Sequence, residues 1–193
     1  MAHTIRPDAR YQASYLEAAD EFDGAHRDGD GELARFDAAG RQVETFTRTS
    51  LADPETFRRF VAWRRADELP ATPRRPGYVP CTFLWLVEGD TYLGSVALRH
   101  ELDDFLLREG GQVGYSVRPS ARRQGHATTA LREVLEIAGQ MGMGRVLITC
   151  EEGNVGSRAV IERVGGVYED SRADMRRYWF DVPEPGVVGV RPH

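Results

Sequence analysis

Short runs in which apolar and polar residues alternate occupy the middle of the chain. Thr82–Gly89 and Thr91–His100 are rich in aromatic and β-branched residues, and Gly89-Asp90 separates them. This pattern predicts an antiparallel hairpin. The same signal predicts a short first strand over Thr4–Pro7 and further strands over 111–117, 145–150, 165–170 and 172–182.

Apolar residues at helical spacing flank these runs. The clearest case is 124–141, where apolar residues repeat at three- and four-residue intervals and can pack on a sheet: Ala127, Ala130, Leu131, Val134, Leu135, Ala138 and Met141. Asp53-Pro54 is typical of a helix start, and this helix should extend to about Leu69. Other helical segments are predicted over 11–22, 102–109 and 155–164, the last closed by Gly165-Gly166.

The order of these elements, strands followed by β-α-β-α-β-β, predicts an α/β (α+β) protein with a mixed sheet. A chain of 193 residues is most simply a single domain, 1–193. Within it, 1–80 is a helical N-terminal part and 182–193 a tail. The Gly- and Asp-rich segment 23–32 should be a solvated loop, and 69–80 a proline-rich connector.

Composition narrows the function classes. The net charge of −5 argues against a broad basic surface for nucleic acid, and the longest apolar runs are too short to span a membrane. The N-terminus lacks the apolar core of a signal peptide, so we expect a cytoplasmic protein. Cys81 and Cys150 lie in or beside apolar runs and should be buried thiols, with no metal site.

The chemistry-bearing segment lies between strand 111–117 and helix 124–141. The first turn of a helix carries backbone N–H groups without intrahelical partners, and its dipole attracts anions. Gly125 allows close approach to the backbone, and Arg122 and Arg123 add positive charge. Residues 122–127 therefore favour a pyrophosphate site, although a basic surface turn would give a similar pattern. The spacing matches neither a P-loop nor a dinucleotide fingerprint.

This segment resembles the GNAT superfamily of acetyl-CoA-dependent N-acyltransferases. Arg122-Arg123-Gln124-Gly125-His126-Ala127 matches the Arg/Gln-x-x-Gly-x-Gly/Ala motif of the family. The segment beginning at Asn154, NVGSRAVIERVGGV, occupies the place of the family's second conserved segment. The resemblance extends over about 82–168 and is weak before that.

The resemblance implies a GNAT-like, mostly antiparallel central sheet flanked by helices, with an N-terminal helical elaboration that shapes the acceptor side. It implies acetyl-CoA as cosubstrate and no metal. The residues that would bind acetyl-CoA are Ser116, Val117 and Arg118 through their main chains along the pantetheine arm, Arg122, Arg123, Gln124, Gly125, His126, Ala127 and Thr128 around the pyrophosphate, and Asn154 with Ser157. Asn154 would also serve as a helix N-cap.

The usual proton-transfer residues of the family are missing. The position of its thiolate-protonating tyrosine is Ile161, and the position of its glutamate base falls at Gly111-Gln112. The attacking amine must lose a proton, which requires a base or a water path. We therefore expect His100 or Glu151 to relay that proton.

These observations predict an N-acetyltransferase that transfers the acetyl group of acetyl-CoA to a primary amine of a small molecule by direct attack. A protein N-terminus or lysine as acceptor stays open, as do a longer acyl group and a homodimer. The alternative of a different class is a CoA-binding regulatory or interaction module that has lost turnover. Release of free thiol across a panel of amines distinguishes the two.

Overall fold

The computed structural model describes residues 1–182, so the predicted tail lies almost entirely outside the described residues. The elements are β1 (His3–Ile5), α1 (Gln12–Phe22), β2 (Ala34–Phe36), β3 (Gln42–Thr45), α2 (Pro54–Ala66), β4 (Cys81–Glu88), β5 (Thr91–Arg99), β6 (Val113–Val117), α3 (His126–Gln140), β7 (Gly144–Glu151), α4 (Val155–Val164), β8 (Val167–Arg172) and β9 (Met175–Val182). A short helical turn also covers Leu106–Gly110. The predicted elements are confirmed, and the hairpin β2–β3 is an addition to them.

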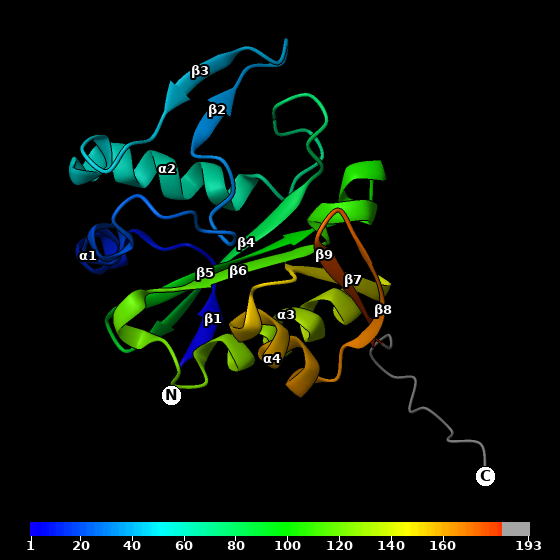
Figure 1. Ribbon diagram of the computed structural model, residues 1–193. Helices are drawn as coiled ribbons and strands as arrows, with labels where there is room; N and C mark the ends of the chain where they lie inside the picture. Colours follow the sequence, from blue (N-terminus) through cyan, green and yellow to red (C-terminus); the bar gives the residue numbers. More distant parts are fainter. Residues whose placement is uncertain (183–193) are drawn as a thin grey trace.

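Apart from the separate hairpin β2–β3, the strands form two antiparallel groups that meet at one point (Figure 1). One has the order β1-β4-β5-β6, and the other has the order β7-β9-β8. The Gln112 amide donates to the Leu147 carbonyl at 2.7 Å, and the Leu147 amide donates to Gln112 Oε1 at 3.1 Å. Beyond this junction β6 and β7 are not paired, so a space opens between the two groups. The expected mixed fold, mostly antiparallel and flanked by helices, is confirmed.

Alternation along β4 divides the interior into two cores. Leu84 and Leu86 belong to the core that includes α3 and α4, whereas Trp85 and Val87 belong to the core formed with α1 and α2. Successive side chains of a strand point to opposite faces, so one apolar strand is buried on both sides. Figure 1 shows the same layers, with α1 and α2 on one side of the sheet and α3 and α4 on the other.

Helix α3 is anchored by the face that its sequence predicts. Ala130, Leu131, Val134 and Ala138 are buried in the core. Burial of such side chains stabilises the folded state by roughly 1.5–3 kcal/mol for each large one. Met141 departs from the prediction because the helix ends at Gln140, and its side chain is 42% exposed.

Helices α1 and α2 are held together by aromatic packing. The predicted N-cap of α2 is confirmed, since Asp53 accepts a hydrogen bond from the Thr56 amide at 2.8 Å. Tyr15 of α1 stacks on Trp85 of β4 with ring centroids 5.2 Å apart, and it meets Phe57 of α2 edge-on. The N-terminal helices therefore belong to the same packed structure as the sheet.

The segment His26–Glu32, which we call the strap, corrects the prediction of a solvated loop. Its residues cross the sheet in order. The Asp28 carbonyl lies over Gly114 of β6, Gly29 lies on the Ser95 carbonyl of β5, and Gly31 lies against Phe83 of β4. A Cβ at position 29 would come within 2.1 Å of the Ser95 oxygen. Glycine at these positions lets the strap lie flat on the strands.

Asp30 fixes the strap from below and is only 6% exposed. Its carboxylate accepts from the Ser95 hydroxyl and lies 2.9 Å from Arg27 Nε. The Tyr15 hydroxyl is 3.4 Å from the same carboxylate. A buried charge is tolerated when hydrogen bonds and an opposite charge compensate it. The glycine and aspartate content of this segment therefore serves packing as well as chain reversal.

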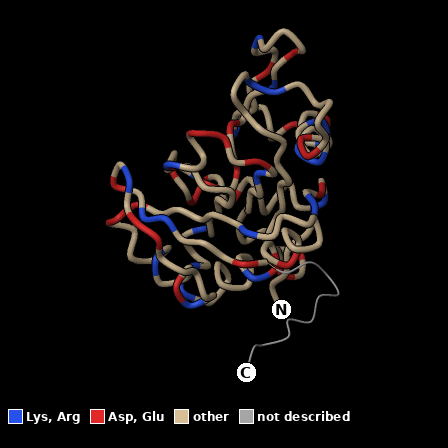
Figure 2. Tube along the Cα trace, turned by 90° about the vertical axis from the view of Figure 1, so that its right-hand side faces the viewer, with Lys and Arg blue, Asp and Glu red and all other residues tan. Residues whose placement is uncertain are grey.

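Charged residues of both signs are interspersed along the Cα trace, and neither sign dominates the trace as Figure 2 shows it. Attraction of an anionic ligand must therefore come from local groups. Within residues 1–182, none of the helices has the length and apolar character needed to cross a bilayer.

Candidate functional site

A cavity of 680 Å³ lies between β6 and α4, at the place where β6 and β7 have separated. We call it the slot. Its floor includes Tyr115 and Val117 of β6, and one end is formed by the turn 122–125 and the first residues of α3. Along β6 the lining ends at Tyr115, before the junction of Gln112 with Leu147. The slot therefore runs along β6 from a basic turn toward that junction.

Strand pairing decides which main-chain groups of β6 face the slot. The Arg118 amide donates to the Leu93 carbonyl at 2.8 Å, and Ser116 pairs with Ser95 in the same ladder. Hydrogen-bonding directions alternate along an antiparallel strand, so the main chains of Tyr115 and Val117 point away from β5. Consistent with this, the Val117 carbonyl accepts from Arg122 Nε at 3.1 Å. Of the three main chains expected along the pantetheine arm, that of Val117 points toward the slot, whereas those of Ser116 and Arg118 point toward β5.

The turn before α3 leaves its donors open. Gly125 is the N-cap, with φ of +87°, and no side chain caps the helix. The N–H groups of His126, Ala127 and Thr128 have no intrahelical partner because they form the first turn. Among the described residues, nothing lies within 4 Å of a Cβ built on Gly125. The N–H groups of His126, Ala127 and Thr128, together with Arg122 and Arg123 beside them, can thus receive a diphosphate.

Most of the residues expected to bind acetyl-CoA line this one cavity. They are Ser116, Val117, Arg122, Arg123, Gly125, His126, Ala127, Thr128, Asn154 and Ser157. Arg118 and Gln124 do not line it. Gln124 instead donates from its side chain to the Ser120 carbonyl at 3.3 Å.

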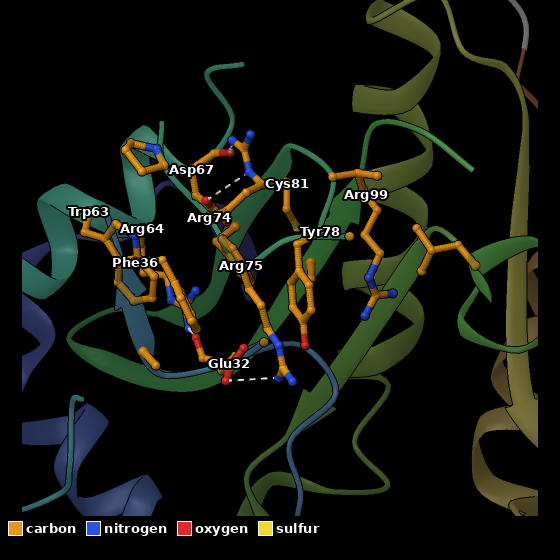
Figure 3. Close-up of a pocket in the computed structure, with 18 of the residues that line it drawn as sticks. Glu32, Phe36, Trp63, Arg64, Asp67, Arg74, Arg75, Tyr78, Cys81 and Arg99 are labelled. Carbon is orange, nitrogen blue, oxygen red and sulfur yellow. Dashed lines mark hydrogen bonds and ion pairs between the residues drawn. The ribbon is translucent and has the colours of Figure 1, made fainter. Parts of the chain in front are cut away.

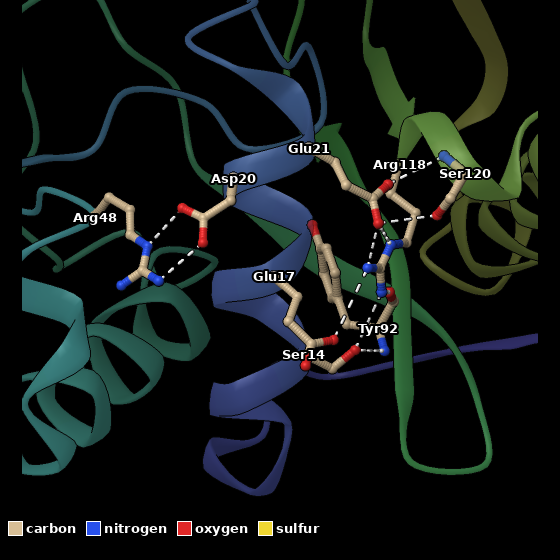
Figure 4. Close-up of polar contacts among 8 residues, drawn as sticks. All are labelled: Ser14, Glu17, Asp20, Glu21, Arg48, Tyr92, Arg118 and Ser120. Carbon is tan, nitrogen blue, oxygen red and sulfur yellow. Dashed lines mark hydrogen bonds and ion pairs between the residues drawn. The ribbon is translucent and has the colours of Figure 1, made fainter.

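Arg118 has a structural place between α1 and the turn (Figure 4). Its guanidinium is 9% exposed and is held by Glu21, with a further bond to the Tyr92 carbonyl at 3.2 Å. The other oxygen of Glu21 accepts from the Ser120 amide at 3.0 Å. The hydrogen bond from Arg118 lowers the pKa of Glu21 to about 2. This carboxylate therefore connects helix α1 to the start of the turn.

Helix α4 contributes a hydroxyl pair to the slot. Asn154 caps the helix as predicted, accepting from the Ser157 amide at 3.0 Å. The Tyr115 hydroxyl is 2.8 Å from Ser157 Oγ, and both residues line the slot. Burial raises the pKa of Tyr115 to about 12, so its hydroxyl keeps its proton at neutral pH. The pair can donate a proton to a group in the slot.

His26 and Asp28 on the strap also line the slot, and the sequence did not single them out. His26 Nε2 lies 3.0 Å from Asp28 Oδ1, and both side chains are mostly exposed. The only sequence signal was the pattern His-Arg-Asp-Gly-Asp-Gly, whose glycines allow the strap to pack on β5 and β6. Its position over the slot depends on contacts distant in the sequence.

The two residues expected to relay a proton lie elsewhere. His100 follows β5, where its amide donates to the Pro80 carbonyl and its ring lies 2.9 Å from the Thr82 hydroxyl. Burial lowers the pKa of His100. Glu151 is the exposed last residue of β7 and pairs with Met175. Neither residue lines the slot.

The comparisons with known proteins agree with this geometry. A family model of the acetyltransferase (GNAT) domain matches residues 25–167. A search of curated proteins gave no match.

Three solved structures resemble the chain in fold. A ribosomal L7/L12 alpha-N-protein acetyltransferase in complex with coenzyme A is 13% identical, with a TM-score of 0.58 over 94% of both chains. The microcin C7 self-immunity acetyltransferase, solved with acetyl-CoA and AMP, is 14% identical, with a TM-score of 0.59 over 94% of this chain and 92% of that one. A ribosomal-protein-S5-alanine acetyltransferase from Vibrio fischeri is 12% identical, with a TM-score of 0.59 over 94% and 93%. Since the family model covers well over half of the 193 residues, the chain belongs to the GNAT family of acetyltransferases.

Proposed function

We propose that this acetyltransferase binds acetyl-CoA in the slot and transfers the acetyl group to a primary amine by direct attack. The observation that carries the proposal is the slot itself, whose basic end holds the open N–H groups of α3. Arg122 and Arg123 lie beside those donors. An elongated ligand with a diphosphate at one end fits this arrangement, since only one end of the slot is suited to phosphate.

We assign the proton acceptor to His26, oriented by Asp28. A protonated amine has no lone pair for attack, so a base must remove its proton. Histidine changes charge near neutral pH, and a carboxylate at 3.0 Å fixes the direction of its ring. The Asp28 carbonyl rests on Gly114, next to Tyr115 at the end of the slot away from the turn. This is the end toward which a ligand anchored at the turn directs its thioester.

The remaining steps use groups of β6 and α4. The Tyr115 amide faces the slot and is available for the oxygen that gains negative charge during attack. The hydroxyls of Tyr115 and Ser157 are available to protonate the departing thiolate. This pair would replace the family tyrosine, whose position is held by the fully buried Ile161.

The acceptor in this proposal is a small primary amine. The resemblance to acetyltransferases of ribosomal proteins favours a protein N-terminus as the second candidate. Both acceptors present the same nucleophile, and a peptide substrate tests the second candidate directly.

The test of the proposed function is release of free thiol from acetyl-CoA, measured with a panel of small amines and with short peptides. We expect turnover with at least one amine and none without an acceptor. Tight binding of acetyl-CoA with no thiol release for any amine or peptide would support the non-catalytic module instead.

The role of His26 is tested by the pH dependence of kcat/KM. His26→Gln should lower kcat/KM by about 10²–10⁴-fold, the range of general-base catalysis, and remove the rise of kcat/KM with pH near neutrality. The Kd for CoA should change little. His3→Gln is the matched control, because His3 is on β1 outside the slot. An unchanged pH profile in His26→Gln would overturn the assignment.

A further inference from the structure

A second cavity, of 170 Å³, lies on the same face of the sheet as the strap (Figure 3). Its floor is formed by Cys81 and Phe83 of β4 with Ala97 of β5. Helix α2 and the proline-rich connector before β4 form its sides. Burial raises the pKa of the Cys81 thiol to about 12, so the floor is chemically inert as well as apolar.

This cavity lies across one strand pair from the slot, and within the described part of the chain the two share no lining residue. Ala97 on its floor is the direct partner of Gly114 on β6, the residue beneath the Asp28 carbonyl. The strap connects the two spaces, because His26 and Asp28 line the slot whereas Gly31 and Glu32 line the second cavity. Since Gly114 directly precedes Tyr115, which lines the slot, the two cavities approach each other at this strand pair.

The arginines in the walls are already engaged by the protein. Arg64 donates to the carbonyls of Asp30 at 2.5 Å and Glu32 at 2.7 Å. Its guanidinium also lies 4.2 Å from the ring centres of both Trp63 and Phe83. Arg74 donates to the Asp67 carbonyl at 3.0 Å. These contacts fix the walls and reduce the positive charge available to a ligand.

Arg74 Nε makes no hydrogen bond, although it lies 3.8 Å from Asp67 Oδ1, and Glu32 is the acceptor of the lining with an incomplete set of partners. Its Oε1 meets Arg75 only at 3.5 Å, and its Oε2 is buried without a hydrogen bond. Figure 3 shows Glu32 facing the cavity together with Tyr78 and Arg75. A buried acceptor without a donor is costly, so a ligand that supplies an N–H beside an apolar group would be favoured.

We propose that this cavity, the acceptor cavity, holds a single ring-sized apolar group of the amine acceptor. The inference rests on the proposed function and specifies its substrate class. A cavity of about 150 Å³ is known to hold benzene, whereas drug-sized ligands need about 300 Å³ or more. The class is therefore a primary amine attached through a short chain to one ring or one branched apolar group. A free arylalkylamine and a peptide with an aromatic first residue share this chemistry.

The experiment compares kcat/KM for 2-phenylethylamine and ethylamine, and for the peptides Phe-Gly-Gly and Gly-Gly-Gly, by thiol release. We expect the ring-bearing member of at least one pair to be preferred about tenfold or more, and the preferred pair identifies the source. Val79→Phe, which adds a ring to the cavity wall, should reduce that preference to about twofold or less. Val43→Phe on the exposed face of β3 is the matched control and should preserve it.

Tyr78→Ala gives a second variant that does not threaten the fold, because Tyr78 is 53% exposed. It should reduce the preference severalfold without changing the Kd for CoA. A preference that is absent in the unaltered protein, or that survives both Val79→Phe and Tyr78→Ala, overturns the acceptor cavity while leaving the acetyltransferase proposal intact. No thiol release with any acceptor, ethylamine included, contradicts the proposed function instead.

Discussion

The turn before α3 and the strap that crosses the sheet are built in opposite ways. In the turn, Gly125 and the first residues of α3 leave backbone donors open to the slot. In the strap, the Asp30 carboxylate is enclosed by donors, and the Arg64 side chain binds the Asp30 carbonyl. The turn can therefore bind an anion from solution, whereas the anion of the strap, the Asp30 carboxylate, is already compensated by the protein.

This difference explains how each region can serve the reaction. Open N–H groups beside arginines keep their interaction energy for a ligand, which is what an anion site requires. A segment whose charges are compensated internally is rigid, and it can hold a pair such as His26 and Asp28 in a fixed place over β6. Substitutions in the strap should therefore affect folding first, and substitutions in the turn should affect ligand binding first.

The largest effect is expected from Asp30→Ala. Arg27, with a side chain 13% exposed, would lose its buried carboxylate, and removal of one partner of a buried pair costs about 3–5 kcal/mol. Urea unfolding should show this as a loss in the free energy of unfolding. Asp104→Ala, at an exposed position, should stay within about 0.5 kcal/mol. A change in Asp30→Ala no larger than in this control would mean that the strap is not pinned by Asp30.

Gly29→Ala tests the close contact of the strap with β5. The added methyl would meet the Ser95 carbonyl, so strand and strap must separate, at a cost of about 1–3 kcal/mol. Gly153→Ala provides the comparison, since its Cβ meets nothing within 4 Å among the described residues. Equal midpoints of thermal unfolding for the two variants would be inconsistent with a strap that lies on the strand.

Gly125→Ala should weaken CoA binding about tenfold. Gly125 has a left-handed backbone, which costs an alanine roughly 1–2 kcal/mol. If the alanine backbone leaves this conformation, the open N–H groups no longer point at the diphosphate, and the affinity falls. Gly165→Ala is matched in backbone conformation, with φ of +103°, but lies at the end of α4 outside the slot. Calorimetric titration should show weaker binding in the first variant alone. Equal Kd values in both would show that the turn does not contact the ligand.

Glu21→Gln should have the smallest effect, a loss of CoA affinity of a few fold, because it loosens Arg118 and Ser120 at the base of the turn. The pKa of Glu21 in the folded protein, about 2, lies below its ordinary value of 4.5. Its contribution to stability is therefore complete above pH 4.5 and is lost as pH falls toward 2. In Glu21→Gln this part of the acid dependence should disappear. Glu17→Gln, whose carboxylate is 69% exposed and 3.9 Å from Arg118, should retain it.

The sequence predicted the turn and its neighbours because their determinants are local. Gly125, the arginines before it and the apolar face of α3 lie within about twenty residues of one another. The N-cap roles of Asp53 and Asn154 are equally local and were also predicted. Each of these features is determined by residues that lie within one or two helical turns of it.

The packing of the strap and the position of His26 over the slot were missed because their determinants are distant. Asp30 is buried by contacts with Tyr15, Ser95 and Arg64. These residues are distant from Asp30 in the sequence, so the local pattern does not predict the contacts. His100 and Glu151 are at strand ends, as expected, but neither lines the slot. Arg118 likewise matches a family position by sequence, whereas its partner Glu21 comes from α1.

The most direct measurement of the central claim is a titration of the ¹⁵N-labelled protein with CoA, followed by its backbone amide resonances. The account predicts that the amides of Gly125, His126, Ala127 and Thr128 shift most, followed by those of Tyr115 and Val117. Saturating CoA that leaves these resonances unchanged, or that shifts only amides outside the slot, would contradict it.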